Sequence, residues 1–407
     1  MAGPGAPRRR PAVSFRNVDI VFGGDPKSAL PLIDQGRSRA EIVNECGQIV
    51  GVKNASLDVG EGEIVVLMGL SGSGKSTLLR AVNGLNAIAR GSVIVHDGDT
   101  EVDVHGCSRR RLRALRRHRI AMVFQQFALL PWRTVNDNVA LGLELDGIRK
   151  AERQRRVAAQ LELVGLAGWG EKRVHELSGG MQQRVGLARA FVNDAPILLM
   201  DEPFSALDPL IRVRLQDELL ALQKKLGRTM IFVSHDLDEA LKIGNRIAIM
   251  EGGEIVQVGT PQEIVLSPSS AYVRNFVAHM NPLNVLRAME VMIPAAELAA
   301  DSEDGPVEIR DGFRLAGGRV LDRAGDPATL VDFQDVAAAP AGALISVPPE
   351  TPLRALIEAR LEHSGPFLIV DGAEDDVVGI IRDKELFGCL VRTREVPLEA
   401  EGEAARH

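Results

Sequence analysis

The stretch "GLSGSGKST" at residues 69–77 constrains the fold of this chain more than any other. It directly follows "EIVVLM" (63–68), a continuous apolar run typical of a strand buried on both faces, and it opens a helical pattern over 75–84. Its spacing fits G-x-x-x-x-G-K-[ST] in the strand–loop–helix context that this phosphate-binding motif requires. A plain Gly/Ser turn would not need that context, so we expect an α/β nucleotide-binding domain.

The chemistry of such a loop assigns roles to its last three residues. Lys75 is expected along the β and γ phosphates, Ser76 on Mg²⁺ and Thr77 near the α phosphate. Backbone N–H groups and the N-terminus of the following helix would bind the remaining phosphate oxygens. The residues expected to provide this backbone cradle are Gly69, Ser71, Gly72, Ser73 and Gly74.

Further apolar runs define the rest of the core. "ILLM" (197–200) and "MIFV" (230–233) each lie next to a helical pattern, which predicts a parallel α/β sheet. The alternation over 12–23 predicts another strand, and the "EGGE" turn within 247–259 predicts a hairpin. "RSRAEIVNECG" (37–47) predicts a short helix that ends at its glycine.

Two adjacent acids, in "ILLMDEP", indicate hydrolysis. Asp201 stands at the carboxyl end of a buried strand, and Glu202 points differently because strand side chains alternate. One carboxylate for Mg²⁺ and one to orient or deprotonate water are the minimum for hydrolysing a nucleotide. No N-K-x-D guanine-recognition motif is present, so GTP is disfavoured.

The helix start "LSGGMQQR" (177–184) is a second candidate phosphate site. Each glycine in a helix costs roughly 1 kcal/mol relative to alanine, yet Gly179 and Gly180 follow Ser178 here. A hydroxyl and bare backbone at a helix N-terminus favour an anion. A chain with one phosphate loop has a use for a second anion site if two chains pair head to tail. The second site of each chain would then cover the ATP bound to the phosphate loop of the other.

Together these motifs resemble the ATP-binding cassette (ABC) subunits of membrane transporters, over about residues 12–280. "GLSGSGKST" resembles the Walker A loop, "ILLMDEP" the Walker B strand and "LSGGMQQR" the family signature, although Met181 replaces the usual Gln and cannot donate its hydrogen bond. The resemblance implies a P-loop ATPase with a RecA-like core, an antiparallel β subdomain and a helical subdomain. It also implies ATP, Mg²⁺ and a homodimer.

The resemblance carries roles onto individual residues. Phe22 in "VFG" would stack on adenine, and Gln125 in "VFQQF" would approach Mg²⁺ and the attacking water while its loop touches the membrane subunit. Glu202 would be the general base. Asp208 in "SALD" would link the two active sites, and His235 in "VSHD" would hydrogen-bond the γ phosphate. The implied metal-binding residues are Ser76, Gln125 and Asp201.

Longer stretches indicate which member of the family this is. "GQIVGVKNASLDVGEGEI" and the insertion before it, about residues 24–50, resemble the ATPase subunits of bacterial importers of glycine betaine, choline or proline betaine. "LLPWRTVNDNV" is also similar to nitrate and sulfonate importers, which are the rival assignment beside amino-acid importers. A non-transport ABC ATPase is less favoured because the chain lacks long coiled-coil insertions and tandem cassettes.

The implied partners are a transmembrane permease and, through it, a periplasmic or extracellular substrate-binding protein, with no nucleic acid. No apolar run reaches the ~18 residues of a membrane span, so we expect a peripheral protein on the cytoplasmic face. The three cysteines are isolated and predict neither disulfides nor a zinc site. The seven arginines of 108–120 are interpreted as a solvated helix face.

The chain is expected to contain a second domain. Residues 285–407 hold 24 acids and 12 bases, a net charge of −12, against −7 for the whole chain. Residues 343–395 resemble a cystathionine-β-synthase-type (CBS) module, in which Thr351 caps a helix with the apolar stripe Leu353, Leu356, Ile357 and Leu361. The expected divisions are a disordered 1–11, an ABC domain 12–284, an α+β CBS-like regulatory region 285–396 whose first module is not visible in the sequence, and an acidic tail 397–407.

Overall fold

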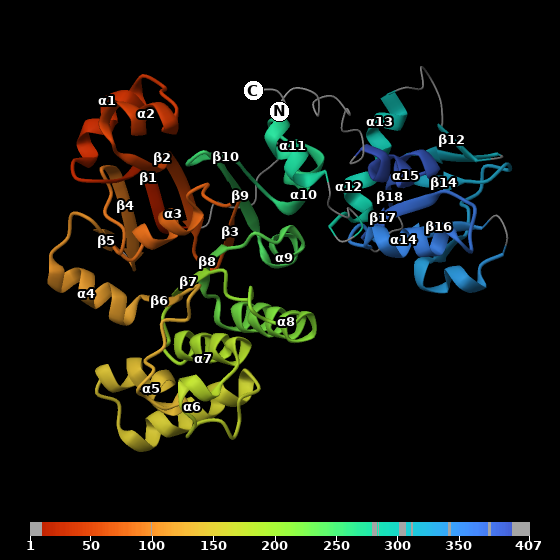
Figure 1. The fold of residues 1–407 in the computed structure, drawn as a ribbon. Helices are drawn as coiled ribbons and strands as arrows, with labels where there is room; N and C mark the ends of the chain where they lie inside the picture. Colours follow the sequence, from red (N-terminus) through yellow and green to blue (C-terminus); the bar gives the residue numbers. More distant parts are fainter. Residues whose placement is uncertain are drawn as a thin grey trace, which may run out of the picture. The chain divides into compact units, whose positions relative to one another are not determined.

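The computed structural model describes residues 10–98, 100–278, 283, 285–300, 307–310, 312–340, 343–372 and 376–392. The chain forms two compact units, Met1–Thr260 and Pro261–His407 (Figure 1). This division falls earlier than residue 284, where the change in composition suggests a boundary. Residues 1–9 of the expected disordered start, and the whole acidic tail 397–407, lie outside the described residues.

A six-stranded sheet forms the centre of the first unit, in the order β10-β9-β3-β8-β7-β6. Its neighbours pair in parallel except β9 and β10, which form the predicted hairpin. The strands are β3 (Ile64–Met68), β6 (Ile120–Val123), β7 (Ile197–Asp201), β8 (Thr229–Val233), β9 (Arg246–Glu251) and β10 (Glu254–Gly259). Every residue of β3, β7 and β8 is buried, which explains their uninterrupted apolar sequences.

An antiparallel sheet in the order β2-β1-β4-β5 lies against this centre. Its strands are β1 (Pro11–Phe22), β2 (Ile49–Gly60), β4 (Arg90–Asp97) and β5 (Thr100–Asp103). Phe15 and Val93 of this sheet belong to the same apolar core as Leu67 of β3 and Leu78 of α3 (Lys75–Ala81). The shared core fixes the antiparallel sheet beside the phosphate loop.

The insertion between β1 and β2 folds into η1 (Pro26–Ala29), α1 (Leu30–Asp34) and α2 (Arg39–Cys46). It has its own small apolar cluster, in which Ile33 and Ile42 pack with Val21 and Val50 at the strand ends. Helix α2 ends at Gly47, with φ 70°, so the predicted short helix is confirmed.

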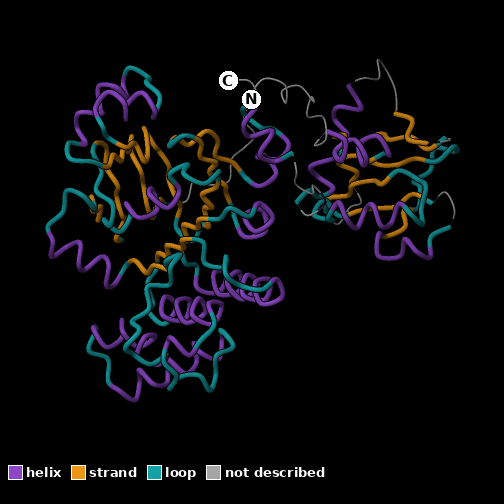
Figure 2. Tube along the Cα trace, in the orientation of Figure 1, coloured by secondary structure: helices purple, strands orange, loops and turns teal. Residues whose placement is uncertain are grey.

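The helices between β6 and β8 are α5 (Val135–Leu145), α6 (Lys150–Leu163), η2 (Val174–Glu176), α7 (Gly179–Phe191) and α8 (Pro209–Leu226). Of these helices, α5 and α6 lie farthest from the two sheets, while α7 and α8 lie beside the central sheet (Figure 2). Helix α9 (Leu237–Ile243) follows β8, and α4 (Arg109–His118) precedes β6. Helix α4 buries Leu115 and exposes most of its arginines, as expected for a solvated face.

The second unit is a mixed α/β region. One sheet has the order β11-β18-β17-β16-β15, and β12-β13-β14 form a separate antiparallel sheet. The strands are β11 (Ile293–Pro294), β12 (Val307–Arg310), β13 (Phe313–Ala316), β14 (Arg319–Leu321), β15 (Leu330–Asp332), β16 (Leu344–Val347), β17 (Phe367–Asp371) and β18 (Asp376–Ile381). The helices are α10 (Pro261–Leu266), α11 (Ala271–Val277), α12 (Ala288–Val291), α13 (Ala295–Ala300), η4 (Phe333–Ala338), α14 (Leu353–Arg360) and α15 (Asp383–Arg392).

Two expectations about α14 are wrong. Pro352 rather than Thr351 is the N-cap, without a side-chain hydrogen bond, because the helix begins one residue later than expected. Leu361 follows the last helical residue and is 85% exposed, so the stripe ends before it. In the described part of the chain, no helix has the length and apolarity needed to cross a bilayer.

Candidate functional site

The phosphate loop connects β3 to α3 through three glycines whose backbone conformation disfavours other residues. Gly69, Gly72 and Gly74 have φ of 142°, 79° and 102°, which L side chains rarely adopt. A Cβ on Gly69 would lie 2.1 Å from the carbonyl oxygen of Met250, and one on Gly74 would lie 2.5 Å from that of Gly51. Neighbouring backbone therefore fixes the curvature of the loop.

Lys75 folds back onto its own loop. Its ammonium donates to the carbonyl oxygens of Gly69 at 2.8 Å and Leu70 at 2.9 Å, and the residue is only 6% exposed. Burial lowers the pKa of Lys75, while the carboxylates of Glu202 and Asp201 oppose that shift. The ammonium of Lys75 is therefore a buried positive charge within the loop, and an anion bound by the loop would pair with it.

Asp201 is fully buried at the carboxyl end of β7 and has two partners from α3. Ser76 Oγ donates to its Oδ1 at 2.6 Å, and Arg80 donates to its Oδ2 through Nη2 at 2.8 Å and Nε at 3.2 Å. Arg80 is not among the site residues predicted from the sequence. Arg80 follows Ser76 by four residues, so the sequence places both on one helix face and could have indicated that they share a partner.

Glu202 gathers the other predicted catalytic residues. Gln125 Nε2 donates to its Oε2 at 3.3 Å, and His235 Nδ1 lies 3.2 Å from the same oxygen. The backbone of Glu202 has φ 49°, uncommon for a non-glycine residue, and its N–H donates to Val233. These side chains follow the ends of three neighbouring strands, β6, β7 and β8, which explains why distant motifs meet here.

Gln183 of α7 is a second residue that the sequence analysis missed. It is 1% exposed, and its Nε2 donates to the carbonyl oxygen of Glu202 at 3.3 Å. The N–H of Ala206 donates to its Oε1 at 3.1 Å. An amide among the apolar positions of a buried helix face was the signal for this role. Gln183 thus connects the signature helix to the segment that carries Glu202.

The signature turn itself is open. Ser178 is the N-cap of α7 and accepts from Met181 N–H at 3.4 Å. Ser178 and Gly179 are exposed, and a Cβ on Gly179 would meet no atom within 4 Å. Asp208 is likewise exposed and caps the N-terminus of α8. The side chains of Ser178 and Asp208 bond only to the first turn of their own helices among the described residues. Because both residues are exposed, a ligand or a second chain can reach them.

Phe22 ends β1 at the edge of the phosphate loop and is 41% exposed. A Cβ on Gly51 would lie 2.8 Å from the ring of Phe22 and 3.0 Å from the methyl group of Thr77. The absence of a side chain at Gly51 therefore lets the predicted adenine-stacking ring and the last residue of the phosphate loop come close together.

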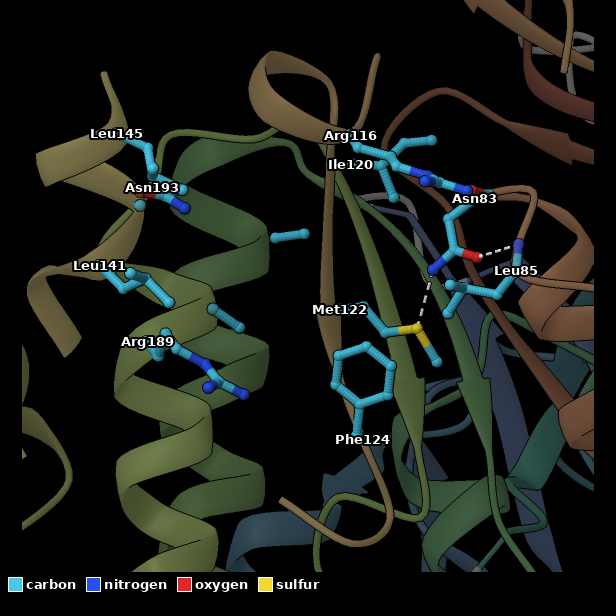
Figure 3. A pocket seen from close by; sticks show the side chains of 13 residues that line it. Asn83, Leu85, Arg116, Ile120, Met122, Phe124, Leu141, Leu145, Arg189 and Asn193 are labelled. Atoms are coloured by element: carbon cyan, nitrogen blue, oxygen red, sulfur yellow. Dashed lines mark hydrogen bonds between the residues drawn. The ribbon is translucent and has the colours of Figure 1, made fainter. Parts of the chain in front are cut away.

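A groove of about 280 Å³ lies beside the loop that carries Gln125 (Figure 3). Leu141, Leu145 and Asn193 form one wall, and Ile120, Met122 and Phe124 the other (Figure 3).

The groove is connected to the loop after Gln125 through Arg189, which also lines it. Arg189 donates to the carbonyl oxygens of Phe127 at 2.8 Å and Ala128 at 2.7 Å, and both of these residues have positive φ. Helix α7 therefore holds a strained loop in place at the groove.

Comparisons with known proteins agree with this geometry. A family profile described as "ABC transporter" matches residues 52–205. The glycine betaine/proline betaine transport system ATP-binding protein ProV of Escherichia coli is 44% identical over 93% of this chain and 98% of its own length. The glycine betaine transport ATP-binding protein OpuAA of Bacillus subtilis is 49% identical over 71% of this chain and 68% of its own.

A solved structure gives the same result for the fold. The dimeric post-hydrolysis state of the ATP-binding cassette MJ0796, bound to ADP and Pi, superimposes with a TM-score of 0.53 and 31% identity, covering 61% of this chain and 98% of that one. The first unit therefore has the ABC-type P-loop ATPase fold, extended by a mixed α/β region at the C-terminus. The chain belongs to the ATP-binding subunits of ABC transporters, in one family with these glycine betaine transport proteins.

Proposed function

We propose that this ATPase drives the import of a quaternary amine, glycine betaine or a close relative. The observation that carries the proposal is the 44% identity to ProV over 98% of its length, which includes the C-terminal unit as well as the cassette. The rivals, importers of nitrate, sulfonates or amino acids, would use the same hydrolysis with another substrate-binding protein.

In the proposed reaction, the phosphate loop binds ATP through its backbone amides and Lys75. Lys75 would exchange its carbonyl partners at Gly69 and Leu70 for phosphate oxygens, because an anion is a stronger acceptor for a buried ammonium. Phe22 would stack on adenine from the edge of the loop. The expected contact of Thr77 with the α phosphate fits its place at the start of α3.

The oxygen atoms of Ser76 and Asp201 fit Mg²⁺, a hard cation that takes few protein ligands besides phosphates and water. Bound there with Gln125 nearby, Mg²⁺ would supply charge neutralisation to the phosphates. Arg80 holds Asp201 in its orientation from the opposite carboxylate oxygen.

We assign proton transfer to Glu202. Its carboxylate would accept a proton from the attacking water, while Gln125 orients that water and His235 hydrogen-bonds the γ phosphate. Both side chains reach Oε2 of Glu202 at 3.2 to 3.3 Å, so they are already assembled around the base. The carbonyl contact from Gln183 restrains the backbone on which Glu202 is carried.

The active form is proposed to be a head-to-tail dimer. Each exposed turn of Ser178, Gly179 and Gly180 would bind the γ phosphate held by the opposite chain, and Asp208 would link the two sites. The N-terminus of α7 provides a positive potential, and the lack of a side chain at Gly179 allows a phosphate to approach its backbone. Hydrolysis removes that shared anion, so the dimer opens.

The groove in Figure 3 is the proposed contact with the transmembrane permease. Its walls combine apolar side chains with Arg116, Arg189 and Asn193, a mixture that suits an amphipathic helix, and the bonds of Arg189 connect it to the loop of Gln125. Contact there would place the chain on the cytoplasmic face of the membrane and transmit dimer closure to the permease. Through that permease, the substrate would come from an extracytoplasmic binding protein.

The C-terminal unit is proposed to be a CBS-like regulatory region. The order β16, α14, β17, β18, α15 supports this proposal for residues 343–395. The described residues between 285 and 340 contribute β11 and β15 to the same sheet and otherwise form the β12-β13-β14 sheet and short helices. Deleting residues 285–407 should leave ATP hydrolysis intact and abolish the response of uptake to ionic strength. An unchanged salt response would contradict regulation.

The function is tested by reconstituting the chain with its permease and binding protein in vesicles. Glycine betaine should stimulate ATP hydrolysis and accumulate against a gradient, and neither should occur with Lys75→Ala. Hydrolysis stimulated by nitrate, a sulfonate or an amino acid, and not by glycine betaine, would favour the rival importers.

A further inference from the structure

The insertion between β1 and β2, which none of the motif roles uses, reaches the phosphate loop through Arg39. This residue begins α2, and its guanidinium makes two backbone contacts with the nucleotide site. Nη1 donates to the carbonyl oxygen of Gly72 at 2.9 Å, and Nη2 donates to that of Gly51 at 2.6 Å.

The element that carries Arg39 is well anchored. Ser38 and Glu41 form a reciprocal capping box, with Glu41 N–H donating to Ser38 Oγ at 3.3 Å and Ser38 N–H donating to Glu41 Oε2 at 2.8 Å. One turn further, Ile42 is 1% exposed and packs with Val21 and Val50. The cap and the apolar contact fix the start of α2, so the guanidinium is presented from a defined position.

A second observation shows that space is kept for this side chain. Gly253, in the turn between β9 and β10, has φ 94°, and a Cβ there would lie 2.4 Å from Nη2 of Arg39. The bare backbone of this turn therefore gives the guanidinium its path to the phosphate loop.

The contact with Gly72 bears directly on the cradle. A trans peptide is planar, so the carbonyl of Gly72 and the N–H of Ser73 point in opposite directions and turn together. A Cβ on Gly72 would meet no atom within 4 Å, so no neighbouring atom packs against that side of the residue. A hydrogen bond to the outer carbonyl thus orients an amide of the loop.

The contact with Gly51 extends this restraint to the base of the helix. The carbonyl oxygen of Gly51 lies so close to Gly74 that a Cβ there would be 2.5 Å from it. Gly74 is the N-cap of α3. The guanidinium of Arg39 holds the carbonyl oxygens of Gly72 and Gly51 at once, and so connects the outer side of the phosphate loop to β2.

We propose that Arg39 is a positioning residue of the phosphate loop, through which the insertion presets the loop for ATP and senses its occupancy. The inference rests on the binding of ATP by this loop. It gives the insertion a role in nucleotide affinity rather than in the chemical step.

The test compares three variants in the full chain, with a non-hydrolysable ATP analogue as the probe. Arg39→Met keeps the aliphatic stem and removes both donors, and should weaken binding roughly tenfold, as expected for lost charge-assisted hydrogen bonds. Arg39→Lys keeps a charged donor and should stay within about threefold of the parent. Arg37→Met is the matched control, because Arg37 is exposed and its ion pairs with described residues, to Glu41 at 3.4 Å and Glu45 at 3.8 Å, are local.

Turnover separates positioning from catalysis. Arg39→Met should raise KM for ATP and leave kcat within about twofold, because Arg39 touches no reacting atom. In the parent chain, the analogue should slow amide hydrogen exchange in residues 38–46, and Arg39→Met should abolish this slowing without lowering Tm.

An Arg39→Met variant with parental affinity and parental exchange would overturn the role of Arg39. A variant that loses affinity and also unfolds at lower temperature, with Arg39→Lys failing to restore either, would equally reject it in favour of a purely structural contact. Lys75→Ala serves as the reference: if its affinity is also unchanged, the assignment of the phosphate loop itself fails.

Discussion

Nδ1 of His235 lies 3.2 Å from Oε2 of Glu202, across the ends of β7 and β8. The side chain of His235 is 63% exposed and that of Glu202 18% exposed, so the imidazole faces the outside of the site while the carboxylate is sheltered. This pair places a candidate base and a candidate phosphate-binding group together within a single chain.

Replacing Glu202 with Gln should stop hydrolysis while ATP still binds. The amide cannot accept a proton from water, so the γ phosphate should persist and hold two chains together. We expect a loss of at least 100-fold in kcat and an ATP-dependent dimer in size-exclusion chromatography. Hydrolysis at the parental rate would show that Glu202 is not the base.

Replacing Arg80 with Ala should destabilise the fold and impair the response to Mg²⁺. Asp201 would keep only Ser76 as a partner while remaining buried. The loss should be about 1–3 kcal/mol, less than for a fully buried ion pair because the Arg80 side chain is 38% exposed. Urea unfolding measures the loss, and exposed Arg113→Ala, on α4, is the control. Parental stability and Mg²⁺ dependence would remove Arg80 from the site.

Replacing Gln183 with Leu should lower kcat more than ATP affinity. The change leaves the carbonyl of Glu202 and the N–H of Ala206 without this partner, so the backbone that carries the base should relax. We expect roughly a tenfold lower kcat.

The neighbouring Gln182→Leu is the matched control. Gln182 donates instead to the carbonyl oxygens of Val174 and Leu177, each at 3.1 Å. Equal effects of the two variants on turnover would indicate a general loss of α7 rather than a specific effect at Glu202.

Glu239 gives a prediction about pH. Burial raises its pKa above the usual value of about 4.5, against hydrogen bonds from Ser234 and Gln216. A raised folded-state pKa favours folding below the unfolded-state pKa, and that contribution is lost as the pH rises through the folded-state value. The stability of Glu239→Gln relative to the parent should therefore increase from pH 4.5 upward.

Urea unfolding at several pH values measures this difference. Asp238→Asn, an exposed change in the same helical turn, should show no such trend. A stability difference between Glu239→Gln and the parent that stays constant with pH would contradict the burial effect.

Local patterns were enough to predict much of the fold. The buried strands, the β9–β10 hairpin, α2 and the α/β class were read from apolar periodicity and turn residues, and the structure confirms them. The start of α14 was misplaced by one residue, since a proline after a threonine fits more than one cap position. The family and its ATPase activity likewise followed from the ordered motifs.

By itself, the sequence identified the candidate residues for the chemistry, because the phosphate loop, the strand-end acids and the signature turn are contiguous patterns with local physical reasons. The tertiary structure alone decided which side chains hold them. Arg39 comes from the insertion before β2, Arg80 from α3 and Gln183 from α7, and each bonds to a residue that is distant in the chain, so these contacts depend on how the elements pack around the sheet. Helix spacing offers a signal for Arg80 and Gln183, but only the fold shows which groups they hold, because the sequence does not reveal the partner of a hydrogen bond that joins distant segments.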